Sequence, residues 1–264
     1  MNTVPSLLRH PASPIVGQNI VTVASGKGGV GKTWFSVTLA HALARAGRRV
    51  LLFDGDLGLA NVDLQLGLAP TGDLDSVLAK RIDIEDAVTH FAPGGFDIVA
   101  GRSGSGALAA LSAAHLTGLR DSLINLASGY DTAVVDLAAG VEQAVRILSA
   151  AAAVRLVVTT DEPTALTDAY AFIKLTTVRA NATSTRIIVN MAANESEGRR
   201  TYATLSKACQ NFLGMTPVLA GVVRRDRHVR EAIRSQAPLL TRYPNCEAAA
   251  DVEAIARMFT EPRQ

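Results

Sequence analysis

The chain has 264 residues, a formal net charge of +2, 48% hydrophobic residues and 19% charged residues. This composition supplies a large apolar core and excludes a mainly disordered chain. The charge excess does not indicate nucleic acid as a specific partner, because that function needs clustered basic residues. The two cysteines, Cys209 and Cys246, are too isolated for a disulfide framework or a paired-cysteine metal site. We interpret both as core thiols of a protein from a reducing compartment.

The beginning of the chain differs from the rest. Residues 1–17 contain Pro5, Pro11 and Pro14 and lack the continuous apolar stretch of a secretory signal, so we predict a flexible N-terminal extension. Residues 18–264 are predicted to form a single domain. Nowhere does an apolar run approach the roughly 20 residues of a membrane span, and we expect a cytoplasmic protein.

Short apolar runs alternate with longer helical patterns, which is typical of βαβ units. The fold class predicted is therefore α/β, a mostly parallel sheet of about seven or eight strands covered by helices on both faces. The expected strands are 19–24, 49–53, 96–100, 132–136, 155–159, 186–190 and 218–223.

The first helix is predicted over 34–46, where apolar residues share one face and Gly47 follows as a left-handed cap. The later helices are expected at 116–127, 141–151, 164–179, 199–212, 227–234 and 247–258.

Residues 26–33 fit the pattern Gly-x-x-x-x-Gly-Lys-Thr between a predicted strand and a predicted helix, which identifies a P-loop NTPase. Glycines allow backbone N–H groups to surround phosphate oxygens, and the helix start adds its positive dipole end. We expect Lys32 to reach the β- and γ-phosphates and the Thr33 hydroxyl to ligate Mg²⁺, so the predicted cofactors are ATP or ADP and Mg²⁺. The predicted nucleotide-binding residues of the loop are Gly26, Lys27, Gly28, Gly29, Val30, Gly31, Lys32, Thr33 and the Trp34 backbone.

A second lysine, Lys27, lies inside this loop although the general pattern does not require it. Its cation can stabilise charge on a transferring phosphoryl group, in its own subunit or in a partner's. The alternative is a solvated side chain.

Carboxylates follow two of the predicted strands. Asp54 and Asp56 flank Gly55 after the second strand, and Asp136 ends the strand at 132–136. The carboxyl edge of a parallel sheet is where ligands bind, and carboxylates there can hold the waters of Mg²⁺. The structural alternatives are turn formation for Asp54 and Asp56, and helix capping for Asp136.

The stretch from Lys27 to Thr33 resembles the deviant Walker A loop of the MinD/ParA ATPases. The resemblance covers nearly the whole chain after Gly17. It implies an ATP-dependent homodimer in which Lys27 is the signature lysine that reaches the other subunit's ATP. It also implies that Asp56 orients or activates the attacking water, that Asp54 lies near Mg²⁺ and that Asp136 is the Walker B acid. The catalytic residues predicted are thus Lys27, Lys32 and Asp56, and the metal-binding residues Thr33, Asp54 and Asp136.

The resemblance also implies roles for Asn190 and Asp168. Asn190 closes a strand, and its amide offers a donor and an acceptor to a purine; in related ATPases the matching asparagine contacts adenine. Asp168 matches a family aspartate that pairs with the signature lysine, so Lys27 and Asp168 are the predicted dimer contact. The alternatives are a turn asparagine and a solvated helix charge. Trp34 departs from the small polar residue of the family, and Ala138 from its glycine.

Within the family, residues 56–63, 162–170 and Asn190 are most similar to the FlhG/FleN branch, which sets flagellar number and placement. The resemblance implies an FlhF-like GTPase or a flagellar regulator as partner, although only Leu8 and Arg9 remain of the branch's N-terminal motif for FlhF. The alternatives are a MinD-like cell-division ATPase, a ParA-like partition protein and, less favoured, an ATP-dependent amide or cofactor synthetase.

Membrane contact is expected to be weak or indirect, at the inner membrane or the cell pole. The last predicted helix has an apolar face, but acidic neighbours favour docking on the core over binding to lipid. A basic cluster could meet an anionic surface, although a solvated helix face is the favoured interpretation. Its members are Arg224, Arg225, Arg227, Arg230 and Arg234.

Overall fold

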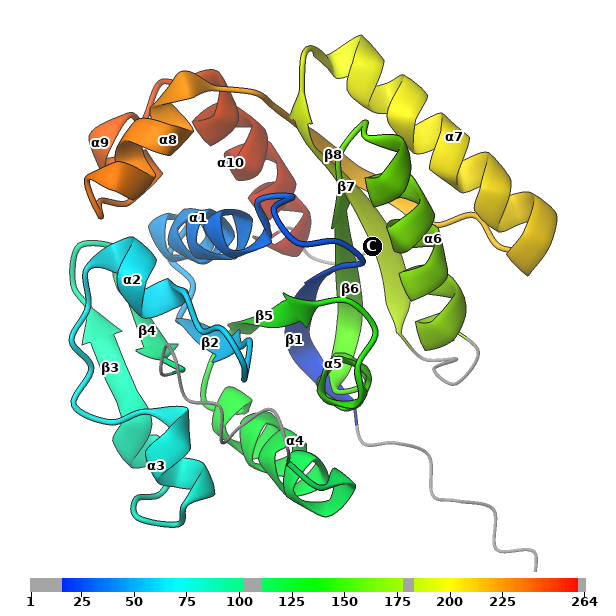
Figure 1. The fold of residues 1–264 in the computed structure, drawn as a ribbon. Helices are drawn as coiled ribbons and strands as arrows, with labels where there is room; N and C mark the ends of the chain where they lie inside the picture. The colour runs from blue at the N-terminus through cyan, green and yellow to red at the C-terminus, as the bar shows by residue number, and fades with distance from the viewer. Residues whose placement is uncertain (1–15, 102–110, 178–182, 261–264) are drawn as a thin grey trace, which may run out of the picture.

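Figure 1 shows the computed structural model, which describes residues 16–101, 111–177 and 183–260. An eight-stranded sheet runs through the molecule in the order β3-β4-β2-β5-β1-β6-β7-β8. Its strands are β1 (Gly17–Ser25), β2 (Val50–Gly55), β3 (Val88–Phe91), β4 (Phe96–Val99), β5 (Thr132–Ala139), β6 (Ala152–Thr159), β7 (Ser184–Ala192) and β8 (Val218–Arg224). The predicted α/β class is confirmed. The predicted extension over 1–17 lies almost entirely outside the described residues, as do Leu8 and Arg9.

All seven predicted strands are present, and seven of the eight strands run parallel. The additional strand, β3, pairs antiparallel with β4 at the sheet edge. It has four residues and only Phe91 in it is buried, so it lacks the long apolar run by which the other strands could be predicted. Very short edge strands of this kind are common, because they leave few backbone groups open to pairing with another chain.

Two helical layers cover the sheet (Figure 1). One core cluster joins α1 (Lys32–Arg45), α8 (Arg227–Arg234), α9 (Leu239–Arg242) and α10 (Glu247–Thr260) to one face. The other joins α4 (Ala113–Ala127), α5 (Gln143–Ser149), most of α6 (Pro163–Thr177) and α7 (Glu195–Leu213) to the opposite face. The short helices α2 (Val62–Leu66) and α3 (Leu74–Leu78), the 3-10 turn η1 (Glu85–Ala87) and α9 were not predicted. One turn is too short to show a helical repeat in sequence.

Helix α1 begins at Lys32, two residues earlier than predicted. Gly31 has φ 85°, a left-handed conformation that turns the loop directly into the helix. The predicted stop at Gly47 also has a left-handed backbone, with φ 81°. The apolar face of α10 is not available to lipid, since Val252, Ile255 and Ala256 are buried in the core. Core docking of this helix is confirmed.

The two cysteines differ. Cys209 is buried in the second core cluster, as predicted. Cys246 is only partly buried and lies directly before α10, so its interpretation as a core thiol holds only in part. In the part of the chain that the structure describes, no helix has the length and apolar character needed to cross a membrane.

Candidate functional site

A cavity of about 880 Å³ lies where β1, β2 and β5 end at their carboxyl termini. It is lined by the loop after β1, the loop after β2 and the end of β5. Among the predicted site residues, the lining includes Lys27, Gly28, Gly29, Val30, Gly31, Lys32, Thr33, Trp34 and Asp56. Parallel strands bring these segments together because their carboxyl ends share one edge of the sheet.

The glycine loop has the backbone that a phosphate cradle needs. Gly29 and Gly31 have φ values of 79° and 85°. Gly28 faces open space, since a Cβ built there would meet no atom within 4 Å. A loop whose backbone stands free on its outer side can direct N–H groups to an anion. Gly26 has a different role: a Cβ there would lie 2.1 Å from the backbone oxygen of Asp168, so glycine lets α6 approach the loop.

Asp136 is the centre of a buried polar cluster at the start of α1. One carboxylate oxygen accepts hydrogen bonds from Lys32 Nζ at 3.3 Å and Ser36 Oγ at 2.9 Å. The other accepts from Thr33 Oγ1 at 2.6 Å. Burial raises the pKa of Asp136, whereas the Lys32 ammonium and these donors oppose the rise. Ser36 was missed in the sequence, although it lies one helical turn after Lys32 and therefore faces the same side.

Asp54 organises the loop after β2. It is fully buried, and its two oxygens accept backbone N–H groups of Asp56, Asn61 and Val62, each at 3.2 Å. Burial, and then the charge of Asp136, raises the pKa of Asp54 to about 7. The two carboxyls are neighbours because Asp54 pairs with Asp136 in the register of β2 and β5.

These residues fit a magnesium ion. Among the described residues, Lys32 forms an ion pair with Asp136 and Asp54 has no cationic partner, so a bound cation would favour the ionised form of both carboxyls, whose pKa values burial raises. Carboxylate and hydroxyl oxygens, with waters, are the ligands that Mg²⁺ takes beside phosphates. Thr33 and Asp136 would hold the ion or its waters, and Asp54 would act from the adjacent strand. Bound there, Mg²⁺ would neutralise charge on nucleotide phosphates.

Asp56 is half-buried and lies on the wall of the cavity. Its Oδ1 accepts hydrogen bonds from the N–H groups of Leu59 at 3.0 Å and Gly58 at 3.4 Å. Among the described residues, no backbone N–H donates to the Oδ2 atom of Asp56. A carboxylate in this position can hold a water inside the cavity.

Lys27 has partners within its own chain. Its Nζ lies 2.5 Å from Glu162 Oε2 and 2.8 Å from Thr164 Oγ1, both at the beginning of α6. Sequence reasoning missed this pair. Asp168, which we predicted as the partner across a dimer, lies on the same helix with its backbone against Gly26. The contact between Lys27 and Asp168 concerns two subunits and stays a prediction.

Asn190 and Trp34 are buried beneath the loop. The Asn190 side chain donates to the Val30 carbonyl at 2.8 Å and accepts from the Met191 N–H at 2.9 Å. The amide thus supports the phosphate loop, and its predicted contact with adenine stays a prediction. The Trp34 side chain belongs to the first core cluster, so its backbone is the part suited to the nucleotide.

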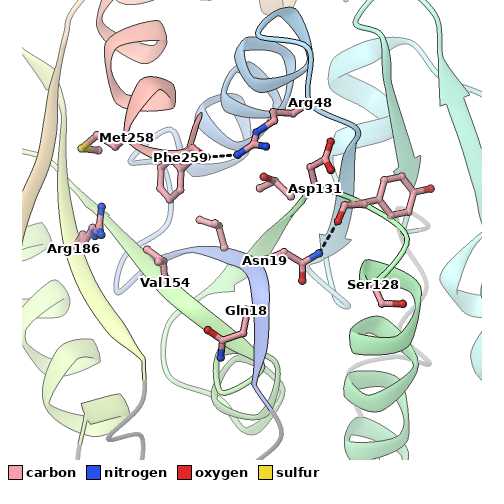
Figure 2. A pocket seen from close by; sticks show the side chains of 12 residues that line it. Gln18, Asn19, Arg48, Ser128, Asp131, Val154, Arg186, Met258 and Phe259 are labelled. Carbon is pink, nitrogen blue, oxygen red and sulfur yellow. Dashed lines mark hydrogen bonds between the residues drawn. The ribbon is translucent and has the colours of Figure 1, made fainter. Parts of the chain in front are cut away.

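A second cavity, of about 540 Å³, lies at the other end of the strands, beside their amino termini (Figure 2). Asn19, Arg48, Asp131, Arg186 and Phe259 are among its lining residues. The Arg48 guanidinium donates to the Phe259 carbonyl across its rim. None of the predicted site residues contributes to it, and strand amino ends are not where open parallel sheets bind their ligands.

A phosphate loop that continues into a helix, a buried lysine, and carboxyls from two adjacent strands together define a magnesium- and ATP-dependent P-loop ATPase. Residues 21–239 match the model of the CobQ/CobB/MinD/ParA nucleotide binding domain, and the chain belongs to this family.

Two relatives and one solved structure make the comparison more specific. The chain is 41% identical to the antiactivator FleN of Pseudomonas aeruginosa, over 90% of this chain and 85% of FleN. It is 30% identical to the flagellum site-determining protein YlxH of Helicobacter pylori, over 90% of this chain and 81% of YlxH. The septum site-determining protein MinD of Pyrococcus horikoshii, in complex with Mg-ADP, superposes with a TM-score of 0.76. That structure is 26% identical and covers 91% of this chain and 95% of its own.

Proposed function

We propose that this protein is a Mg-ATP-dependent dimerising ATPase switch that controls the number or placement of flagella. The observation that carries the proposal is the assembled phosphate loop with a second lysine at its rim, in a chain 41% identical to an antiactivator called FleN. The name of the YlxH relative also concerns flagellar site determination, which supports the same process.

In this proposal each residue of the site has one task. The loop N–H groups and Lys32 bind the phosphates, and Thr33, Asp54 and Asp136 hold Mg²⁺ and its waters. Asp56 positions the attacking water, and Lys27 stabilises negative charge on the phosphates of the opposite subunit. Asn190 contacts adenine or holds the loop in place for it.

The rim of the cavity supports a dimer. Leu59 and Leu64 are 70% and 55% exposed, and Ile233 also projects beside them on the lining. Exposed apolar side chains around a polar site are typical of a surface that a partner covers. A second subunit docked phosphate loop to phosphate loop would bury them and bring its Lys27 to the bound nucleotide.

The direct test is Lys27→Ala, measured by light scattering for ATP-dependent dimerisation and by phosphate release for turnover. Both should be lost, whereas ATP binding to the monomer should remain, because Lys32 is intact. The matched control is Lys207→Ala, which removes an exposed cation from α7. Unchanged dimerisation and turnover in Lys27→Ala would reject the proposal.

The cellular part of the proposal has a separate test. Deleting the gene and counting flagella should change their number or position, and the Lys27→Ala protein should not restore them. An unchanged flagellar pattern together with displaced division septa would favour a MinD-like role, and DNA-dependent ATPase activity that falls steeply with salt would favour a ParA-like one.

We also propose an FlhF-like GTPase or a flagellar regulator as partner, and a cytoplasmic location with weak or indirect attachment at the membrane or cell pole. Pull-down with the purified candidate and ATP tests the partner. Vesicle sedimentation with and without ATP tests the attachment.

A further inference from the structure

Three potential metal ligands converge outside the nucleotide site, between the starts of two helices. Asp226 caps α8, His228 lies in its first turn, and Cys246 directly precedes α10. One ligand atom from each of the three lies within 4.8 Å of the others. The Asp226 side chain is only 7% exposed and that of His228 is 29% exposed, so the cluster is a half-enclosed recess.

The contacts exceed what helix capping requires. Asp226 Oδ1 caps α8 by accepting the His228 N–H at 2.9 Å. The same carboxylate also contacts the His228 Nδ1 atom at 2.7 Å and accepts the Cys246 thiol. Asp226 Oδ2 also accepts the Ala248 N–H of α10 at 3.4 Å, and these backbone donors account for the capping role of the carboxylate. An imidazole and a thiol gathered on the same carboxylate form a mixed nitrogen, sulfur and oxygen set.

We propose that Asp226, His228 and Cys246 bind one Zn²⁺ ion, with water as the fourth ligand. Thiolate, imidazole and carboxylate are the ligands of tetrahedral zinc sites, whereas Mg²⁺ prefers oxygen alone. Zinc–ligand bonds of about 2.0 to 2.3 Å place ligand atoms about 3.3 to 3.7 Å apart. Asp226 Oδ1 and His228 Nδ1 are 2.7 Å apart, and the three ligand atoms all lie within 4.8 Å of one another, so side-chain movements of about 1 Å would bring them to this spacing.

The proton balance is simple. Burial raises the pKa of Cys246, so the thiol is protonated near neutral pH without metal. Binding forms the Zn–S bond and releases that proton to solvent, while His228 binds as the neutral imidazole.

One nearby arginine is already paired, although Arg225 and Arg227 also flank Asp226 in the chain, and packing holds the imidazole in place. Arg224, the arginine of β8 nearest in sequence, is neutralised by Asp251 at 2.8 Å and Glu247 at 2.6 Å. The Tyr243 ring packs on His228 with centroids 4.6 Å apart and limits its rotation. A metal here would join the start of α8 to the start of α10. Helix α8 also carries Ile233 on the nucleotide cavity, so the ion would fix one wall of that cavity.

The test uses the full chain without an affinity tag or nucleotide, in excess Mg²⁺ so that oxygen-only sites are filled. Zn²⁺ is titrated against a chromophoric chelator, and Co²⁺ is used as a spectroscopic probe. We expect one Zn²⁺ per chain and a thiolate-to-cobalt charge-transfer band. Cys246→Ser, which retains a capping oxygen, should abolish the band and weaken Zn²⁺ binding about 100-fold, and His228→Gln should weaken it about 10- to 100-fold.

Matched controls come from the same chain. Cys209→Ala removes the other thiol, and His115→Gln removes an exposed histidine of α4. Both should bind Zn²⁺ as the parent does. No Zn²⁺ bound per chain, or equal affinity and an equal cobalt band in Cys246→Ser, would overturn the proposal.

Discussion

Lys27 Nζ lies 2.5 Å from Glu162 Oε2, so the lysine proposed to act across a dimer is held by its own subunit in this structure. Thr164 adds a hydrogen bond at 2.8 Å. Both partners lie at the beginning of α6, which also packs its backbone against Gly26. Lys27 must leave Glu162 before it can reach a second subunit. The ion pair therefore competes with the proposed dimer.

Glu162→Gln should strengthen ATP-dependent dimerisation. The side chains of the pair are 35% and 61% exposed, and an exposed ion pair contributes about 0 to 1 kcal/mol. A homodimer would break two such pairs, one per subunit, which corresponds to at most about 30-fold in the dimer dissociation constant. Analytical ultracentrifugation with a non-hydrolysable ATP analogue measures the dimer dissociation constant. Glu195→Gln, which breaks an ion pair with Arg199 on α7, is the control and should have no effect. A weaker dimer in Glu162→Gln would mean that Glu162 holds Lys27 in its productive position.

Gly26→Ala should destabilise the fold, whereas Gly28→Ala should not. A Cβ at Gly26 would lie 2.1 Å from the Asp168 backbone oxygen, and backbone atoms cannot move aside as a flexible side chain can. Forced contacts of this kind cost about 1 to 3 kcal/mol. At Gly28 the added methyl meets nothing within 4 Å. Urea unfolding without nucleotide should therefore show a lower midpoint for Gly26→Ala alone, and equal midpoints would mean that α6 shifts freely.

Asp54→Asn should remove a pH-dependent destabilisation of the nucleotide-free protein. The pKa of Asp54 is raised from 3.8 to about 7, so between these values the folded chain binds more protons than the unfolded chain. This carboxyl therefore lowers the free energy of unfolding as pH rises from about 4 to 7, by on the order of 4 kcal/mol. The variant lacks that loss, so its stability relative to the parent should rise over this window and level off above pH 7.

Urea unfolding at several pH values measures the difference in free energy of unfolding between Asp54→Asn and the parent. The effects of the other carboxyls cancel in this difference. Asp83→Asn serves as a control, because the Asp83 side chain is exposed and lies outside the lining of the nucleotide cavity. A constant difference between Asp54→Asn and the parent would show that Asp54 stays ionised throughout.

The sequence predicted the strands and the phosphate loop well, because both depend on local patterns. Apolar runs between the predicted helices located the seven parallel strands, which are all the strands except β3. The spacing of the glycines located the phosphate loop. The contacts of individual side chains are harder to predict from the sequence. Glu162 reaches Lys27 across 135 positions of sequence, and Asn190 reaches Val30 across 160. Such pairs depend on the order of the strands in the sheet, in which β1 is followed by β6 and then β7. That order cannot be read from local sequence patterns.

Ser36 and Cys246 show a second limit. Ser36 resembles any helix serine in sequence, and only the position of Asp136 gives it a partner. Cys246 was interpreted as a core thiol because no second cysteine lies nearby, whereas its neighbours in space are Asp226 and His228. Spacing along the chain cannot identify a cluster whose members come from two different helix starts.

Asp56→Ala should separate nucleotide binding from hydrolysis. Among the described residues, the Asp56 side chain accepts hydrogen bonds only from the backbone of its own loop, at Gly58 and Leu59, and it lines the cavity. Removing it takes away the carboxylate proposed to position water while Lys32, Thr33 and Asp136 remain. A positioned base contributes about 10²- to 10⁴-fold to rate, so phosphate release should fall by that factor. Mixing the variant with ATP should give a dimer that persists in size-exclusion chromatography, whereas the parent returns to monomer as ATP is consumed. If the variant fails to bind ATP, Asp56 supports the loop and another group positions the water.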